Sequence, residues 1–435
     1  MDKRKKITIR LVISTDKITE LLFIIFYSMP FCKWVLEQIF GPVNTAVFDR
    51  IFILTILYAT VFVLCVVSRQ YLIVDFVGLL ILIVFYFLLT YMVHPEYQYV
   101  YTREQYGVWE YVLRPDNGIY AYLFVRLISQ PKRLIRSLKT SGYLMYGYSA
   151  LRLYLALSRG YWIEENYLGE SIHLSYNLNF GYSLVIFVCC FIYCAIKEKK
   201  IRYFILAGAG IVMIFLGGSR GPLLNIAIFI AIYILISISE SRKKILYLIA
   251  FTLATIVLLL SYRQILMLTA NILDMLNLPS RTITKLLDGS IAEDNGRTRI
   301  WMAAVDMIKS NPFGYGAMGA RHGLYNIHVV GHPHNVFLEI LIEYGVFLGP
   351  VMIIWFFVNS IRIFIAQDLG EWKYVYLIFF AYASQLLTSY TYWHSTGLWA
   401  VLAVMVCIHE EKKGTKKRTK KGLRERIIHE RKQNL

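Results

Sequence analysis

A histidine stands at the start of an apolar segment in the sequence GHPHNVFLEILIEYGVFLG, residues 331–349. His334 and Asn335 come directly before residues apolar enough to enter a bilayer, and Glu339 and Glu343 lie inside the segment. Polar groups are costly in lipid, so their presence indicates a function or a specific partner. The positive potential at the expected helix N-terminus disfavours a protonated ring. A neutral ring can accept a proton, so we interpret His334 as a candidate general base.

Arginines in two other short motifs could bind the phosphate groups of a substrate. Arg220 lies in LGGSRGPLL, where the neighbouring glycines predict a tight turn that lets a ligand approach the backbone. Arg297 and Arg299 lie in NGRTRIW, at the expected start of a helix. The guanidinium group pairs with phosphate through two hydrogen bonds, so two converging arginines would suit a diphosphate. Each arginine alone also fits an interfacial anchor or a solvated helix start.

The two glutamates and the nearby histidines allow other interpretations. Glu339 lies five residues after His334, roughly 140° around a helix, which places it poorly to orient that histidine. We therefore expect Glu339 and Glu343 to bond to neighbouring helices or to line the cavity. The histidine-rich stretch RHGLYNIHVVGHPH could indicate zinc, but its spacing matches no ligand signature and it contains no cysteine or carboxylate. We expect no metal and no cofactor.

The composition is that of a membrane protein. Hydrophobic residues make up 57% of the chain and charged residues 17%, and the mean hydropathy is +0.52. Soluble proteins are roughly 45–50% apolar and about 25% charged. The six cysteines all fall in apolar segments without metal-ligand spacing, so we interpret them as small core residues.

Apolar segments close to the length that a bilayer requires, roughly 20 residues, recur along the chain. We predict an all-α polytopic integral membrane protein with about twelve transmembrane helices. The expected spans are residues 18–40, 48–67, 71–93, 118–131, 140–158, 176–196, 203–217, 221–239, 245–261, 335–359, 373–389 and 395–409.

Basic clusters indicate the orientation in the plasma membrane. The net charge of +18 is concentrated in DKRKK, KEKKIR, SRKK and the C-terminal tail, and QPKRLIRSLK is interpreted as a further basic loop. Such clusters mark the cytoplasmic side, and threading the chain through an even number of spans places them all there. Both termini are therefore expected to be cytoplasmic. The tail lacks interleaved aromatic residues, so contact with anionic lipid is favoured over nucleic acid.

The predicted organisation has five parts. They are a basic cytoplasmic N-terminus (1–17), nine transmembrane helices (18–261), an extracytoplasmic loop (262–334), three further helices (335–409) and a basic cytoplasmic tail (410–435). The long loop contains QILMLTANILDMLNL and RIWMAAVDMIKS, whose spacing of apolar residues predicts helices. This topology places Arg220, Arg297 and His334 on the same outer face.

Three motifs together resemble the bacterial O-antigen ligase and O-antigen polymerase (Wzy-like) superfamily. They are SRGPLL, GRTRIWMAAVDMIKSNPFGYGAMG and HNVFLEILIEYGVFLG, and the resemblance covers roughly residues 203–360. The family's arginine in a short outer turn corresponds to Arg220. Its arginine four residues before a tryptophan corresponds to Arg297, before Trp301. Its histidine, followed by a small amide or hydroxyl residue, corresponds to His334.

The resemblance implies a metal-independent, GT-C-like glycosyltransferase with its active site on the extracytoplasmic face. Its donor would be an undecaprenyl-diphosphate-linked glycan and its acceptor a second glycan. Arg220 and Arg297 would hold the diphosphate, with Arg299 and Asn335 as further substrate contacts. His334 would take the proton of an acceptor hydroxyl, which attacks the anomeric carbon with inversion. Membrane lipid and a chain-length regulator are candidate partners, and no nucleic acid is expected.

Three functions remain open at this point. In ligases a second glycine is expected three residues after the one at Gly345, but this sequence has Leu348 there and Gly349 next. That departure favours a polysaccharide polymerase over an O-antigen ligase acting on a lipid or protein acceptor. A flippase or transporter for lipid-linked oligosaccharides usually shows internal repeats and ionisable residues at mid-membrane, and the sequence has no such repeat.

Overall fold

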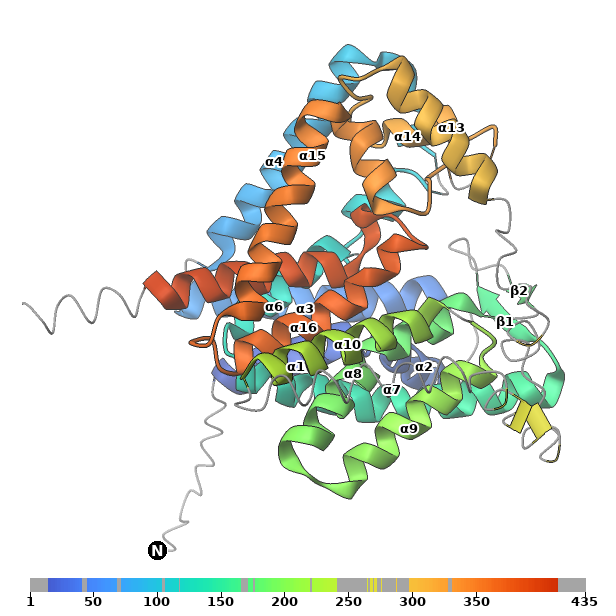
Figure 1. Cartoon of the computed structure of the whole chain (residues 1–435), viewed down its shortest axis with the longest axis vertical. Coiled ribbons are helices and arrows are strands. Elements are labelled where there is room, and N and C mark those ends of the chain that lie inside the picture. Colours follow the sequence, from blue (N-terminus) through green and yellow to red (C-terminus); the bar gives the residue numbers. More distant parts are fainter. Residues whose placement is uncertain are drawn as a thin grey trace, which may run out of the picture.

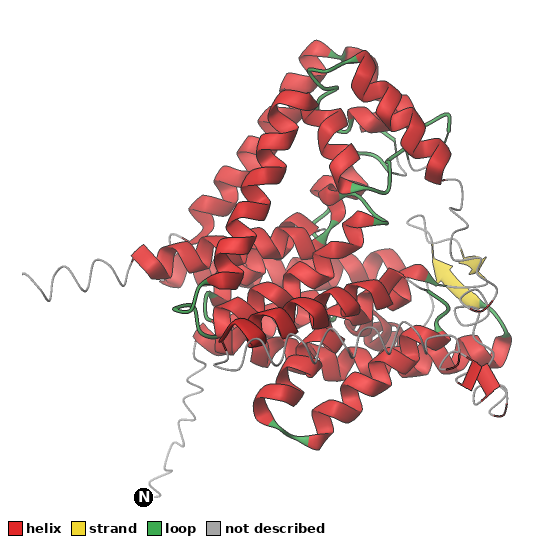
Figure 2. Cartoon of the chain, viewed as in Figure 1, coloured by secondary structure: helices red, strands yellow, loops and turns green. Residues whose placement is uncertain are grey.

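The computed structural model describes residues 15–40, 45–68, 72–103, 106–116, 118–165, 171–174, 177–219, 221–240, 297–327 and 331–413, with isolated positions between 264 and 287. These residues are mostly helical, as predicted (Figure 2). The longer helices are α1 (Thr15–Tyr27), α2 (Met29–Phe40), α3 (Thr45–Ser68), α4 (Leu72–Val93), α6 (Gly118–Ile128), α7 (Pro131–Arg159), α8 (Leu178–Glu198), α9 (Ile201–Leu216), α10 (Gly221–Glu240), α13 (Arg297–Ser310), α15 (Val336–Ile365) and α16 (Glu371–Ala383), and a last helix covers residues 396–413.

Shorter elements connect these helices. The short helices are η1 (Pro95–Tyr97), α5 (Gln98–Tyr101), η2 (Trp109–Leu113), α14 (Gly319–Leu324), η4 (Ser384–Leu387) and η5 (Tyr392–His394). Strands β1 (Trp162–Glu165) and β2 (Ser171–Leu174) form an antiparallel hairpin in which Trp162 pairs with Leu174. The hairpin follows α7, where Gly160 adopts the left-handed conformation that commonly ends a helix.

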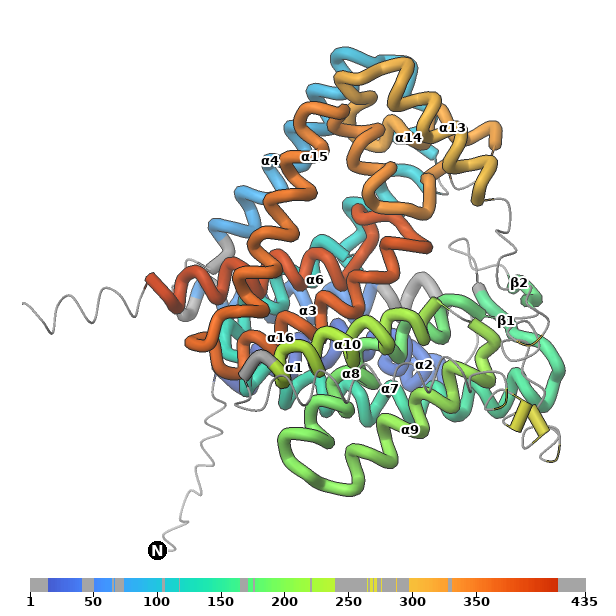
Figure 3. The backbone as a smooth tube through the Cα atoms, in the orientation of Figure 1, coloured from blue at the N-terminus to red at the C-terminus, as the bar shows by residue number. Residues whose placement is uncertain are grey.

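The core of the molecule is a bundle around α8. Helices α7, α9, α10 and α16 all contact α8, and α6 is buried along its whole length. Helices α4 and α15 extend from the bundle, with α13 and α14 packed at their far end (Figures 1 and 3). Large apolar side chains on α4 and α15 are exposed, including Leu82 (63%) and Val351 (60%). Such apolar surfaces suit contact with lipid rather than water.

The number of spans differs from the expected twelve. Among the described residues, four helices are long and apolar enough to cross a membrane: the 74–93 part of α4, α8, the 221–238 part of α10, and α15. The count becomes five if α1 and α2, which meet at 83°, form one span. The predicted span 245–261 lies outside the described residues. The twelve spans are therefore not confirmed, because α6, α9 and α16 have only 11, 16 and 13 residues.

The predicted basic loop QPKRLIRSLK is wrong, because these residues form the first turns of α7. Gln130 caps the helix in an extended conformation and Pro131 follows at a position where no backbone donor is needed. Arg133 is buried, and its guanidinium donates to Asp16 Oδ1 and Glu20 Oε1, both at 2.8 Å, on α1. This pairing lets the helix carry a buried charge in a stretch that otherwise has the composition of a loop.

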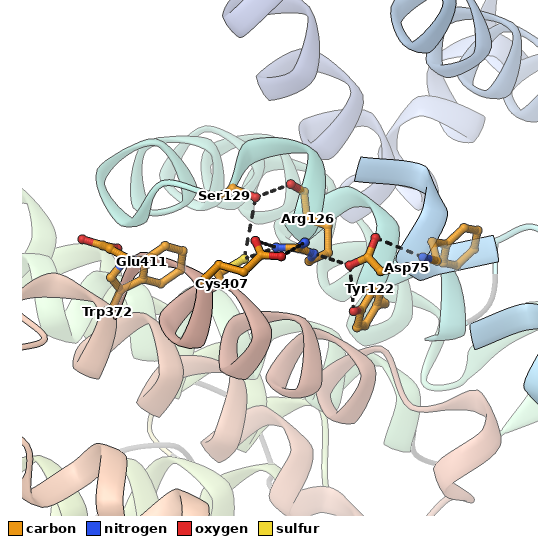
Figure 4. Close-up of polar contacts among 9 residues, drawn as sticks. Asp75, Tyr122, Arg126, Ser129, Trp372, Cys407 and Glu411 are labelled. Carbon is orange, nitrogen blue, oxygen red and sulfur yellow. Dashed lines mark hydrogen bonds and ion pairs between the residues drawn. The ribbon is translucent and has the colours of Figure 1, made fainter. Parts of the chain in front are cut away.

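A second buried arginine joins three helices at one end of the bundle (Figure 4). The side chain of Arg126 on α6 is 3% exposed and donates to Asp75 Oδ2 on α4 at 2.6 Å. Its two terminal nitrogens donate to both carboxylate oxygens of Glu410, on the last helix, at 2.9 Å each. Tyr122 donates to the same oxygen of Asp75 at 3.0 Å. Paired hydrogen bonds of this kind fix both distance and orientation, so this cluster sets how the three helices meet.

Candidate functional site

His334 lies in a short irregular segment, residues 331–335, that leads into α15. Asn335 caps this helix, because its Oδ1 accepts hydrogen bonds from the backbone of Phe337 at 3.0 Å and of Leu338 at 3.2 Å. Helix α15 therefore begins where the sequence predicts, directly after His334. The φ of His334 is 51°, a left-handed value that is uncommon outside glycine and is concentrated at functional sites.

The side chain of His332 supports the left-handed backbone conformation of His334. It is 3% exposed, and its Nδ1 accepts a hydrogen bond from the backbone N–H of His334 at 3.3 Å. The two rings lie 4.2 Å apart at 66°. His332 belongs to the histidine-rich stretch that could have indicated zinc. Its side chain instead contacts the candidate base and helps to hold the backbone of His334.

A hydrogen bond connects the His334 loop to the helix that begins with Arg297. The indole Nε1 of Trp301, on α13, donates to the carbonyl oxygen of Pro333 at 2.9 Å. Arg297 precedes Trp301 by four residues, so the two side chains share a helix face. The structure therefore brings the first turn of α13 to the residue directly before His334.

Arg297 and Arg299 differ in their surroundings. Arg297 is half-buried, whereas Arg299 is exposed. At about 100° per residue, Arg299 points roughly 160° away from the face that carries Trp301. Of the two arginines on α13 that are predicted to bind substrate, Arg297 alone shares the face that is bonded to the His334 loop.

Tyr182, on α8, links several parts of this region. Its hydroxyl lies 3.4 Å from Thr388 Oγ1, and the positive charge of Arg297 acts on the same hydroxyl. The residue before Thr388 is Leu387, whose carbonyl accepts a hydrogen bond from Asn335 Nδ2 at 3.4 Å. Hydrogen bonds and the adjacent residues Leu387 and Thr388 therefore link Tyr182 to the cap of α15, and the charge of Arg297 acts on the same tyrosine.

Arg220 lies outside the described residues, but both of its neighbours are described and pack against the start of α8. A Cβ atom on Gly221 would clash with the hydroxyl of Tyr182, and a Cβ on Gly181 would clash with Ser219 Oγ. The turn between α9 and α10 can approach α8 this closely only because these positions carry glycine. Gly221 thus lies at the tyrosine on which Arg297 acts, and Ser219 lies at the residue before that tyrosine.

Glu339 and Glu343 bond to neighbouring segments, as the sequence predicts. Glu339 accepts hydrogen bonds from Thr391 Oγ1 at 2.5 Å and from the backbone of Tyr392 at 3.3 Å. Glu343 accepts from the hydroxyl of Tyr392, from the indole of Trp393 at 3.2 Å and from the backbone of Met318 at 3.0 Å. Buried carboxylates need such donors, and here they join α15 to the turn before the last helix.

Helix α15 is broken at Gly345, where φ is 72° and ψ is 178°. The turn after α13 supplies hydrogen-bond partners for backbone groups that the break leaves without helical ones. Tyr315 N–H donates to the carbonyl of Ile342 at 2.8 Å, and Val346 N–H donates to the carbonyl of Pro312 at 2.8 Å. The glycine-rich turn NPFGYGAMG therefore pairs with the backbone on both sides of the break.

The tyrosine-rich segment around 97–111 packs against the chain near α14. Tyr101 Oη donates to the carbonyl of Ala317 at 2.8 Å, and Tyr99 Oη lies 3.1 Å from His322 Nδ1. The guanidinium of Arg321 donates to the backbone carbonyl of Tyr106 at 2.7 Å. The segment between α4 and α6 and the segment around α14, distant in sequence, therefore pack against each other.

The burial of His394, in η5, predicts that the stability of the folded protein depends on pH. Burial, and then the charge of Arg114, lower its pKa to about 4; Arg321 acts in the same direction and Asp116 opposes it. Because the unfolded ring binds a proton more readily, stability is expected to be full above about pH 6.5 and to fall toward pH 4, by up to roughly 3 kcal/mol. Thermal unfolding of the purified protein between pH 7.5 and 5 measures this. In His394→Asn the same pH change should have a smaller effect, and equal slopes would contradict the prediction.

Sequence reasoning missed two residues of this region, Tyr182 and Thr388. Both lie in apolar segments far from the motifs, and the packing of α10 against α8 and η4 brings them together. Trp301 could be connected to Arg297 by their four-residue spacing. The sequence gave no signal that its indole would bond to Pro333.

Comparison with known families was informative for one part of the chain. Residues 203–356 match the family model described as O-antigen ligase. The matched region includes α9, α10, α13, α14 and most of α15, and therefore the His334 loop. No curated protein and no solved structure matches the chain.

Proposed function

We propose that the chain transfers glycan from an undecaprenyl-diphosphate-linked donor on the outer face of the plasma membrane, and the match of residues 203–356 to the family model described as O-antigen ligase supports this. The observation that carries this proposal is the hydrogen bond from Trp301 to Pro333. It joins a half-buried arginine, Arg297, to the loop that holds His334. A cation for a phosphate and a base for a hydroxyl are the two groups that such a transfer needs.

In the proposed reaction, His334 takes the proton of an acceptor hydroxyl as its oxygen attacks the anomeric carbon of the donor. The bond from that carbon to the diphosphate oxygen breaks, and the electron pair leaves with the diphosphate. Attack from the opposite face inverts the anomeric configuration. Arg297 and Arg220 stabilise the charge on the departing diphosphate, with Arg299 as a weaker contact.

Asn335 and Tyr182 complete the proposed site. The Oδ1 of Asn335 is used in capping α15, so we assign this residue to positioning His334 more than to binding sugar. The hydroxyl of Tyr182, close to the charge of Arg297, would donate to a phosphate oxygen once the donor is bound. The site would then hold a diphosphate between α8, α13 and the turn before α10.

Two forms of this activity differ in the molecule that accepts the glycan. A polymerase adds the growing chain to a second lipid-linked repeat unit, and we propose this form first. A ligase transfers the finished glycan to a lipid or protein acceptor, and the description of the matching family favours it as the second candidate. In this structure Gly349 packs against Ile340 and Leu341, across the break in α15. Gly349, which stands one residue later than the second glycine expected in ligases, is therefore closely packed in this structure.

The products of a deletion strain distinguish the two forms. Loss of long chains, with single repeat units still attached to the final acceptor, identifies a polymerase. Loss of all attached glycan, with full-length polymer left on the lipid carrier, identifies a ligase. Loss of all polymer, with lipid-linked units trapped on the cytoplasmic face, would instead identify a flippase.

Replacing Arg297 by lysine tests the diphosphate site. Lysine keeps the charge but cannot form the paired hydrogen bonds of a guanidinium, so Arg297→Lys is expected to lower glycan transfer by about tenfold or more. The amount of polymer formed per unit time in complemented cells, normalised to protein in the membrane, measures the change.

Two further arginines serve as comparisons for this substitution. Arg299→Lys is expected to cause a smaller loss, because Arg299 is exposed on the other side of α13. Arg159→Lys, at the exposed end of α7, is the matched control and should leave transfer unchanged. Equal losses for Arg297 and Arg299 would contradict the assignment of the binding face.

A further inference from the structure

A buried serine hydroxyl in the turn between α9 and α10 has no role in the proposed glycosyl transfer. Ser219 is 2% exposed, and its Oγ has no hydrogen-bond partner within the part of the chain that the structure describes. Buried hydroxyls are normally bonded, because one that gives up water without gaining a partner destabilises the folded protein. A ligand that supplies the partner would account for keeping such a group in this turn.

Two glycines of the structure define where this hydroxyl lies. A Cβ atom on Gly181 would clash with Ser219 Oγ, so the hydroxyl lies against the backbone of α8 at that residue. Gly221 lies in the same way against the hydroxyl of Tyr182, the next residue of α8. Because the charge of Arg297 acts on that tyrosine hydroxyl, Ser219 borders the region in which the diphosphate is proposed to bind.

Helix α10 begins two residues after Ser219 and packs against α8 (Figure 1). It has 20 residues, so its first turn carries the partial positive charge of a long helix. The backbone N–H groups of a first turn have no acceptor within their helix, and such turns bind phosphate. Pro222 has no N–H, so this turn offers one backbone donor fewer than usual. Pro222 lies against the same glycine as Ser219, whose hydroxyl can supply a donor there.

We propose that Ser219 donates a hydrogen bond to a phosphate oxygen of the lipid-linked donor, and that the first turn of α10 faces the same phosphate. This inference rests on the proposed function, because it assumes a diphosphate between α8, α13 and this turn. Rotation about the Cα–Cβ bond of Ser219 redirects the hydroxyl from the backbone of α8 to the ligand. The hydroxyl is thus a binding group that lowers the stability of the protein until the ligand is bound.

Replacing Ser219 by alanine tests this role, because stability and binding should change in opposite directions. Ser219→Ala is expected to melt at the same or a higher temperature, since an unpartnered hydroxyl is removed. It should bind a polyprenyl diphosphate about tenfold more weakly, the effect of one hydrogen bond to a charged group. The test uses the purified full chain in detergent, with farnesyl diphosphate as a probe that carries the diphosphate but no sugar. Melting temperature and calorimetric titration measure the two changes.

Ser141→Ala is the matched control. Ser141 is fully buried on α7, and its Oγ likewise has no partner among the described residues, but α7 is not part of the site. This variant should be as stable as the wild type or more so, and should bind the probe equally well.

Three results would overturn the proposal. Unchanged affinity of Ser219→Ala would show that the hydroxyl does not touch the ligand. A lower melting temperature of Ser219→Ala without the probe would show that the hydroxyl has a structural partner. In both cases the proposed function would stand. If the wild type did not bind farnesyl diphosphate, the proposed function would fail together with this inference.

Discussion

His334→Ala is expected to lower the rate of glycan transfer by roughly 10²–10⁴-fold, the usual contribution of a general base. The side chain makes up none of the cap of α15, which depends on Asn335. The variant should therefore reach the membrane in normal amounts and fail only in the chemical step. Gel analysis of cell-surface glycan from a complemented deletion strain measures this, with the amount of protein in the membrane determined in parallel.

His173→Ala is the matched control for this experiment. His173 is exposed on β2, where its ring contacts Tyr161, and it is remote in sequence from every motif of the site. The control should give normal glycan. If His334→Ala gave normal polymer as well, the proposed mechanism would fail and a transport function would have to be reconsidered.

Gly345→Ala is expected to prevent normal folding of the region around the site. The φ and ψ of Gly345 belong to a region of backbone conformation that is essentially restricted to glycine, and occupying it costs other residues about 1–3 kcal/mol. A Cβ atom at this position would also clash with the backbone of Pro312 and Phe313. We expect a loss of about 3 kcal/mol or more, seen as a lower melting temperature in detergent and less protein in the membrane.

Gly208→Ala is the control for this substitution. Gly208 lies in the middle of α9 with nothing within 4 Å of its missing Cβ, so alanine should be neutral or slightly stabilising there. A Gly345→Ala variant that melts at the same temperature as Gly208→Ala would show that the break in α15 is not required.

The helices were more predictable than their relation to the membrane. Apolar length and periodicity predicted nearly every one of the longer helices within the described residues, because burying apolar side chains is what drives their formation. The six short helices were not predicted. The same pattern does not reveal a bend such as that between α1 and α2, nor that α6 is too short to span a bilayer. It also misplaced QPKRLIRSLK, because the partners of Arg133 lie on α1, more than a hundred residues earlier in the chain.

The site was predictable to the extent that its residues occur in recognisable motifs. His334, Arg297 and the glycine-rich turns follow from residue type and spacing. The support from His332, the hydroxyl of Tyr182 and the indole of Trp301 depends on contacts between segments distant in sequence. No local pattern specifies such contacts, because they are decided by how the helices pack.

The break at Gly345 also bears on how the protein is made. Backbone groups inside a bilayer must be paired within the protein, and here the carbonyl of Ile342 and the N–H of Val346 are paired by the turn that follows α13. That turn precedes α15 in the chain, so during translation it is made before its partner. Because each of these hydrogen bonds needs both segments, the turn after α13 and the break in α15 can complete their backbone pairing only together.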